Sequence, residues 1–232
     1  MIDSTGLAGQ TIRSVYLSDK YPNFPKAGET DALRIRIKKN KVNILWNCYF
    51  TGDNANEKAF KSTYRKVITK AIEKKWSGTF NVKGVKRVKV KTKVWDKTDG
   101  KDHIYATGQK WSKITFKNSA GISQVEWPSK VLWWGGWSRS NPGNMKLFVG
   151  DSRNGNSNRY SKDNLKIVAA HEFGHILGIK DGYGSNKTKK INSIMCDQWG
   201  SYNNIDQSKR KATGKDIEKA LDAYNSNKIQ SW

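Results

Sequence analysis

Two histidines one helical turn apart are the residues of this chain best suited to hold a metal ion. They belong to the string His171-Glu172-Phe173-Gly174-His175. Residues four apart lie on one face of a helix, so both imidazoles can reach the same ion. Glu172 follows the first histidine, where it can take a proton from water beside the metal without ligating it. The spacing therefore predicts a helix that carries a hydrolytic metal site, with Glu172 as the general base.

A third candidate ligand, Asp181, follows ten residues after the first histidine. A residue at that distance cannot share the face of a straight helix, so the chain must end the helix and turn back. Gly178 can provide this turn, because glycine adopts positive φ angles without steric cost. Three protein ligands and one open position form a hydrolytic zinc site. We therefore expect Zn²⁺ to be held by His171, His175 and Asp181.

Hydrophobic periodicity indicates the helices that must position these residues. Ser161 can cap the motif helix, with Asp163 in its first turn and Gly178 just past its end. A long amphipathic helix is expected over residues 54–76. Thr213 can cap a last helix.

Alternating apolar residues predict the strands. The strand expected over residues 88–94 has one apolar and one wholly basic face, typical of a solvated sheet face or an anion-binding stripe. The other expected strands are an edge strand at 34–38 and further strands at 42–50, 114–116, 131–133 and 145–149.

Composition excludes several classes of protein. The 232 residues suit one domain with a small extension. No apolar run is long enough to predict a membrane span, and two cysteines cannot build a disulfide-rich scaffold. Ten Trp, nine Tyr and seven Phe argue against disorder. The 43 basic and 20 acidic residues give a net charge of +23, which predicts attraction to polyanions.

Polar, turn-rich residues 1–40 are interpreted as an N-terminal extension or linker with an edge strand, and residues 41–232 as the catalytic domain. The first residues lack the basic and apolar regions of a signal peptide. The protein is therefore either cytosolic or a module cut from a longer secreted precursor. The linker-like start at residues 3–9 fits the second case, so we expect a secreted or extracellular protein that is part of, or processed from, a longer precursor. Cys48 and Cys196 are interpreted as two separate thiols, and His103 as an exposed residue.

The extended string from His171 to Asp181 resembles the metzincin clan of zinc peptidases, whose motif HExxHxxGxx ends in His or Asp. The Asp-ended form is similar to the snapalysin-type small neutral proteases. Metzincins also have a downstream tight turn with a Met beneath the metal, and Ser193-Ile194-Met195 matches this turn. The family order is strand, long helix, several strands, motif helix, Met-turn and C-terminal helix, which is the order expected here over residues 41–226.

One position departs from the family pattern. Several metzincins have a Tyr two residues after the Met, where it can swing onto the metal or the oxyanion, but this chain has Asp197 there. Tyr183 and Tyr202 are the candidates to replace it.

The resemblance implies an α+β, metzincin-like fold: a twisted mixed β-sheet with a long backing helix, a zinc-binding active-site helix and a C-terminal helix. It implies a monomeric zinc-dependent endopeptidase with Glu172 as general base and Met195 as the floor of the site. The substrate would run extended along an edge strand upstream of the motif helix. A secreted bacterial protease and a toxin module are both compatible with these features.

Three alternatives remain open. The third ligand could be Glu218, within the Glu-x-x-x-Asp pattern that ends at Asp222. The chain could be a non-catalytic basic module that binds nucleic acid or cell-wall polyanions, because it combines a net charge of +23, a Lys-faced strand and interleaved tryptophans. The two motif histidines could also be ordinary core residues of a helix.

Overall fold

The computed structural model describes residues 15–52, 55–59, 62–99, 107–126, 139, 141–151, 158–159, 161–181, 193–195 and 209–227. Several residues named above lie outside this described part: His103, the tryptophans from Trp133 to Trp137, the expected strand at 131–133, Tyr183, Cys196, Asp197 and Tyr202.

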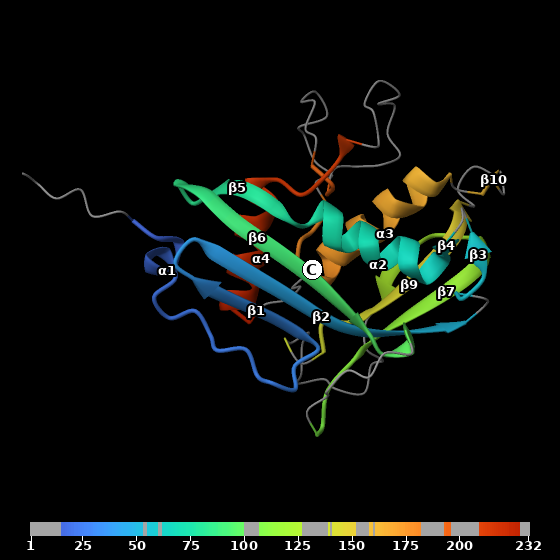
Figure 1. Ribbon diagram of the computed structural model, residues 1–232, viewed down its shortest axis with the longest axis horizontal. Coiled ribbons are helices and arrows are strands. Elements are labelled where there is room, and N and C mark those ends of the chain that lie inside the picture. The colour runs from blue at the N-terminus through green and yellow to red at the C-terminus, as the bar shows by residue number, and fades with distance from the viewer. Residues whose placement is uncertain are drawn as a thin grey trace, which may run out of the picture.

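A mixed eight-stranded β-sheet forms the frame of the molecule (Figure 1). Four mutually parallel strands lie at its centre in the order β6-β2-β7-β9. They are β2 (Lys41–Gly52), β6 (Val85–Asp96), β7 (Ser112–Ala120) and β9 (Asn144–Asp151). Four antiparallel strands flank them: β1 (Leu33–Lys38) beside β2, β5 (Gly78–Val82) beside β6, and β8 (Gln124–Glu126) and β10 (Asn158–Arg159) beside β9. The α+β class is thereby confirmed, as are the predicted strands within the described residues.

Two of the three long helices begin where their caps predict. Helix α3 (Lys162–Ile176) starts after Ser161, whose side chain accepts a hydrogen bond from the backbone N–H of Asn164. Helix α4 (Gly214–Asn225) starts after Thr213, whose side chain accepts one from the backbone N–H of Asp216. Each cap satisfies a backbone donor that the first helical turn leaves without a partner.

The long helix begins ten residues later than residues 54–76 predict. Helix α2 (Tyr64–Lys75) starts after Thr63, whose side chain accepts from the backbone N–H of Lys66. The preceding chain folds back as the short strands β3 (Lys58–Ala59) and β4 (Ser62–Thr63). The N–H groups of Tyr64 and Arg65 donate to the carbonyls of Glu57 and Ala55. This tertiary hairpin, and not the apolar periodicity, determines where the helix begins.

Aromatic packing fixes the motif helix against the sheet. Phe173 of α3 lies with its ring centroid 5.1 Å from that of Trp46 on β2 and 5.9 Å from that of Trp76. The indole N–H of Trp76, at the end of α2, donates to the carbonyl of Ala170 at 2.7 Å. All three rings are fully buried, so α3 is held in a defined position relative to β2 and α2.

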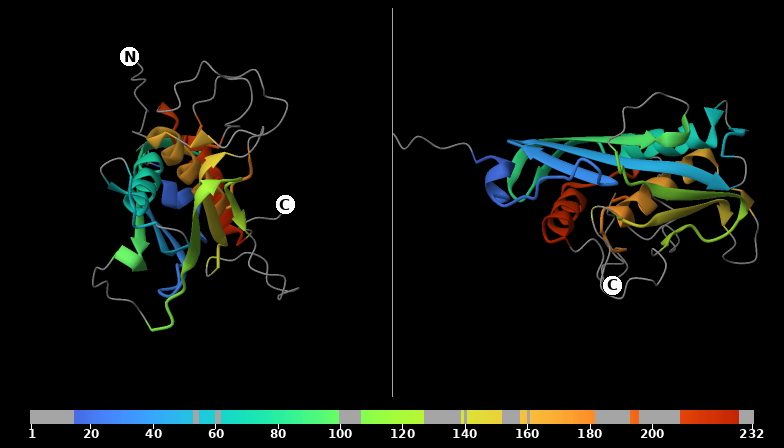
Figure 2. Two further views of the ribbon diagram at one scale, coloured as in Figure 1. Left: turned by 90° about the vertical axis from the view of Figure 1, so that its right-hand side faces the viewer. Right: turned by 90° about the horizontal axis from the view of Figure 1, so that it is seen from below.

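The described part of the N-terminal segment packs onto the same core. Leu17 of the short helix α1 (Leu17–Lys20) and Tyr21 are buried. The Tyr21 hydroxyl donates to Asp222 on α4 at 3.0 Å. Figure 2 shows this segment, in dark blue, beside the sheet. Within the described residues, no helix is both long and apolar enough to cross a membrane.

Candidate metal centre

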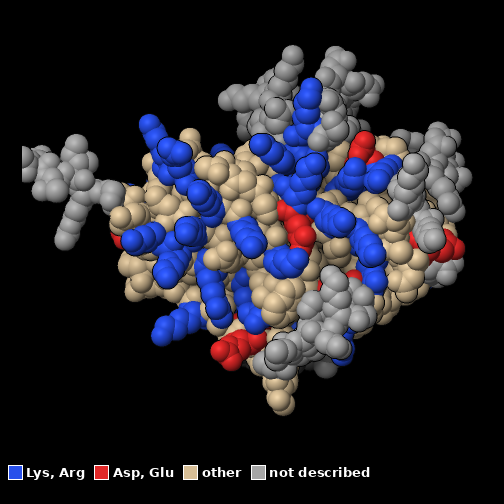
Figure 3. Space-filling view, viewed as in Figure 1, with Lys and Arg blue, Asp and Glu red and all other residues tan. Residues whose placement is uncertain are grey.

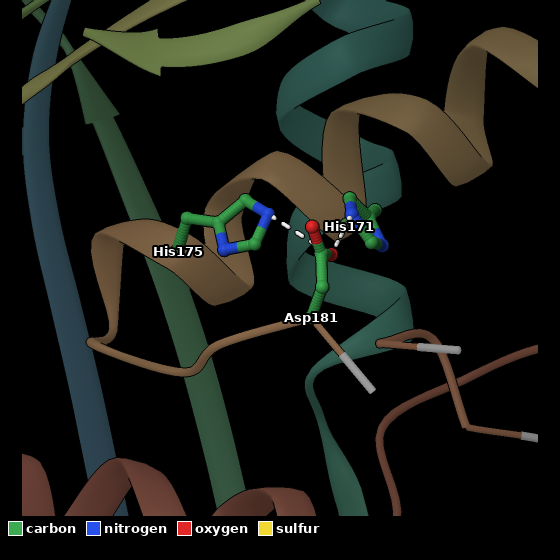
Figure 4. Close-up of side chains that lie close together, drawn as sticks. All are labelled: His171, His175 and Asp181. Carbon is green, nitrogen blue, oxygen red and sulfur yellow. Dashed lines mark ion pairs between the residues drawn. The ribbon is translucent and has the colours of Figure 1, made fainter. Parts of the chain in front are cut away.

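Three side chains predicted as ligands meet at the C-terminal end of α3 (Figure 4). The Nε2 atoms of His171 and His175 lie 2.9 and 3.4 Å from Oδ1 of Asp181. One ligand atom from each residue lies within 4.8 Å of the others. Ligands bound to zinc at about 2.0–2.1 Å in a tetrahedron are about 3.3 Å apart. The trio could therefore hold a metal ion of this size.

The turn that brings Asp181 back to the histidines is a Schellman motif. The N–H of Gly178 donates to the carbonyl of His175 at 2.9 Å, and the N–H of Ile179 donates to that of Gly174 at 3.0 Å. Gly178 has φ +83°, the left-handed conformation that this motif requires and that glycine adopts without strain. The predicted function of Gly178 as the helix-ending residue is confirmed, and the reversal places Asp181 opposite the two imidazoles.

Backbone carbonyls orient both imidazole rings. The Nδ1 atom of His171 lies 2.9 Å from the carbonyl oxygen of Ile194, and that of His175 lies 2.8 Å from the carbonyl oxygen of Ile179. A carbonyl only accepts hydrogen bonds, so each Nδ1 carries the proton. In a neutral imidazole this leaves a lone pair on Nε2. Both rings therefore present their ligating nitrogen to Asp181.

The electrostatics of this cluster favour a cation at its centre. Oδ1 of Asp181 is buried and accepts no well-formed hydrogen bond from the described residues. Burial alone would raise the pKa of the Asp181 carboxyl, but the two imidazoles outweigh it and hold that pKa well below its usual range. Burial alone would lower the pKa of His175, but Asp181 and Glu172 outweigh it and raise that pKa. The donor set, two imidazole nitrogens and one carboxylate, is one that zinc accepts.

Glu172 lies beside the ligands and is only 6 % exposed. Its negative charge contributes to the raised pKa of His175, so the carboxylate is close enough to act on groups in the cluster. A carboxylate adjacent to a metal site but outside its ligand set has the placement required of a general base.

Met195 packs against the motif helix at Gly174. Its side chain is buried, and a Cβ added to Gly174 would collide with the Met195 sulfur. Position 174 lies between residues 171 and 175 of α3, so the absence of a side chain there lets the thioether reach the helix. The function of Met195 as a floor of the site stays a prediction of the resemblance.

A buried hydrogen-bond network connects α4 to the turn that carries Met195. Asp216 accepts at 2.8 Å from the Ser193 hydroxyl and also from the backbone N–H and hydroxyl of Thr213. Ser193 in turn accepts from the N–H of Met195 at 3.0 Å. Asp216 is not among the residues predicted from the sequence, although Thr213-x-x-Asp216 is a capping-box pattern that signals its contact with Thr213.

This network positions a ligand indirectly. The same turn contributes the Ile194 carbonyl that holds His171, and the Ile194 N–H donates to Lys211 just before α4. The cap of α4 therefore fixes the backbone that orients one imidazole.

Glu218, the alternative third ligand, lies elsewhere. Its Oε2 atom accepts a hydrogen bond from the backbone N–H of Lys83 at the β5–β6 turn, at 3.2 Å. The group of described residues that could hold a metal ion contains Asp181 and not Glu218.

No protein-family model matches this chain, and no curated protein matches its sequence. Its function is therefore inferred from its own residues and their geometry.

Replacing Ser193 with alanine is expected to weaken zinc binding as well as lower stability. The change removes one buried hydrogen bond to Asp216 and one acceptor for Met195, which costs about 1–3 kcal/mol in the free energy of unfolding. It also loosens the carbonyl that orients His171, and losses of this kind cost about 10–100-fold in metal affinity. Urea unfolding and competition with a chromophoric chelator measure the two effects.

Ser112→Ala is the matched control. The Ser112 hydroxyl is buried and accepts from the Trp46 indole N–H at 3.0 Å, on the sheet and outside the Met195 turn. The Ser112→Ala variant should therefore have a lower free energy of unfolding and an unchanged zinc affinity. Equal zinc affinities for both variants would contradict a positioning function for Ser193.

Proposed function

We propose that this chain is a zinc-dependent endopeptidase of metzincin type. In this proposal His171, His175 and Asp181 hold the zinc and Glu172 is the general base. The observation that carries it is the convergence of two Nε2 lone pairs and one buried carboxylate oxygen, with Glu172 directly beside them. Two imidazole nitrogens and one carboxylate oxygen that converge on one point form a ligand set that zinc accepts.

Each residue of the proposed site has a separate function in peptide hydrolysis. A bound zinc ion supplies a Lewis acid that polarises the scissile carbonyl and activates a water molecule. Glu172 accepts the proton of the attacking water and passes it to the leaving amine. His171 and His175 keep their orientation because the Ile194 and Ile179 carbonyls hold their Nδ1–H groups.

The arrangement of elements supports the metzincin resemblance. From β2 onward the described chain runs strand, helix α2, several strands, motif helix α3, the turn at Ser193 to Met195 and the last helix α4. Met195 under Gly174 adds to this support, because it relates the turn to the motif helix in space.

We propose that the substrate peptide pairs with the edge strand β8. Within the described residues this strand pairs with β9 alone, it runs antiparallel to β9, and it contacts α3. Its other edge can pair with an extended peptide, which would receive main-chain hydrogen bonds near the motif helix. The biological setting that we propose is a secreted bacterial protease or a toxin module of a longer precursor.

The test combines metal content with proteolysis. Purified protein is expected to contain about one zinc per chain and to cleave an unfolded protein such as casein. A chelator should abolish cleavage, and added zinc should restore it. A chain that binds no zinc after reconstitution would contradict the proposal and would favour the non-catalytic polyanion-binding alternative.

A further inference from the structure

The outward face of the sheet carries a regular array of cations. Residues that are directly paired across neighbouring strands point to the same face. The register of β1, β2 and β6 therefore defines three rows: Lys38–Lys41–Lys89, Arg36–Asn43–Lys91 and Arg34–Leu45–Lys93. Seven of these nine positions are Lys or Arg, and none is acidic. We call these seven residues the cationic face: Arg34, Arg36, Lys38, Lys41, Lys89, Lys91 and Lys93.

The cationic face is turned to solvent. The alternate residues of the same strands, such as Val42, Ile44 and Val90, are buried against the core. Figure 3, from the viewpoint of Figure 1, shows Lys and Arg side chains spread over this side with few carboxylates among them, and α4 lies behind the sheet in that view. The metal centre belongs to α3, which packs against the buried side of the sheet through Phe173 and Trp46.

Most of this charge has no counterion among the residues that the structure describes. Lys93 pairs with Glu73 at 3.3 Å, and the Arg34 guanidinium lies over the ring of Trp95. The other five cations make no ion pair with any described residue. Burial and the charge of Arg36 lower the pKa of Arg34, which shows that positive charges on this face act on one another.

The geometry of the array selects among anionic partners. Same-face residues lie about 6.6–6.8 Å apart along a strand and about 4.7–4.9 Å apart across strands. These spacings are within the Debye length of about 8–10 Å, so the cations repel one another until anions approach. The array extends in two dimensions. A linear polyanion follows a single line across it, and the surface of a nucleic-acid duplex curves away from its outer rows. None of the nine positions is aromatic, and the ring of Trp95, the next residue of β6 on this face, is covered by the Arg34 guanidinium, so the rows offer no open platform for stacked bases.

We propose that the cationic face docks this protein on the surface of a bilayer that contains anionic lipids. A planar distribution of negative headgroups can meet all three rows at once. Of the described residues, the exposed large hydrophobic side chains are Val15 and Ile122, and neither belongs to these rows. Binding is therefore electrostatic and peripheral, and it leaves the α3 side of the sheet free. This proposal does not depend on the proposed peptidase activity.

Vesicle co-sedimentation of the full chain tests it. The protein should bind phosphatidylcholine vesicles that contain about one third phosphatidylglycerol, and it should not bind phosphatidylcholine alone. Bound protein should be released as salt rises from about 0.1 M to about 1 M, because the Debye length falls from about 10 to about 3 Å. Failure to bind anionic vesicles at low salt would overturn the proposal.

Paired charge reversals localise the binding. Each Lys or Arg near an anionic surface contributes about five-fold in partitioning, so Lys89→Glu with Lys91→Glu should weaken binding at least about thirty-fold. Lys215→Glu with Lys219→Glu changes the net charge equally on exposed positions of α4 and should have little effect. Lys38→Glu with Lys41→Glu is a second reversal on the cationic face, at the β1–β2 turn, should the change in β6 prevent folding.

Two further outcomes would overturn the proposal. Equal losses with the β6 and α4 pairs would mean that net charge, and not this face, determines binding. Tighter binding to duplex or single-stranded DNA than to anionic vesicles, lost with the β6 pair, would assign the cationic face to a nucleic acid.

Discussion

Glu172→Gln is expected to lower kcat/KM for peptide hydrolysis by about 10²–10⁴-fold, the usual contribution of a general base. Glutamine has nearly the same shape as glutamate but cannot accept the proton of the attacking water. Because Glu172 is not a ligand in the proposed site, bound zinc and thermal stability should change little. Peptide cleavage kinetics, zinc analysis and thermal melts of the same preparation measure the three quantities.

Glu218→Gln is the control for this variant. Glu218 accepts a hydrogen bond from Lys83 and lies outside the metal-binding group, so its loss should preserve both hydrolysis and zinc. A Glu172→Gln variant that hydrolyses peptides with the kcat/KM of the wild type would rule out the general-base function. Loss of zinc from Glu218→Gln would instead support Glu218 as the third ligand.

Asp181→Ala is expected to weaken zinc binding by more than about a hundred-fold. Changes in groups that only support a ligand cost about 10–100-fold, and Asp181 is proposed to contact the metal itself. The variant keeps His171 and His175 but loses the single anionic ligand. Zinc should raise the Tm of the wild type, since it binds the folded state, and should no longer raise that of the variant.

Asp163→Ala serves as the matched control on the same helix. Asp163 is exposed in the first turn of α3 and pairs with Lys166 at 2.7 Å. Its removal should cost only a few tenths of a kcal/mol, as exposed ion pairs do, and leave zinc affinity intact. Unchanged zinc binding by Asp181→Ala would move the third ligand elsewhere and contradict the site as described.

Local interactions account for the features that the amino-acid sequence predicts correctly. Ser161 and Thr213 cap helices through donors three residues away, and Gly178 ends α3 through hydrogen bonds that span up to five residues. The spacing of His171 and His175 sets their common face in the same way. These features depend on backbone geometry over one or two turns, so residue types and spacing suffice to predict them.

Contacts between segments far apart in the chain depend on the three-dimensional fold and could not be predicted from the sequence. The Ile194 carbonyl that orients His171 comes from 23 residues downstream, and the Ser193–Asp216 hydrogen bond spans another 23. The start of α2 depends on the fold of the hairpin before it. The cationic face exists only because strand register aligns charges from three strands. Such contacts are selected by packing and by strand pairing between segments far apart in the chain, which no local pattern specifies.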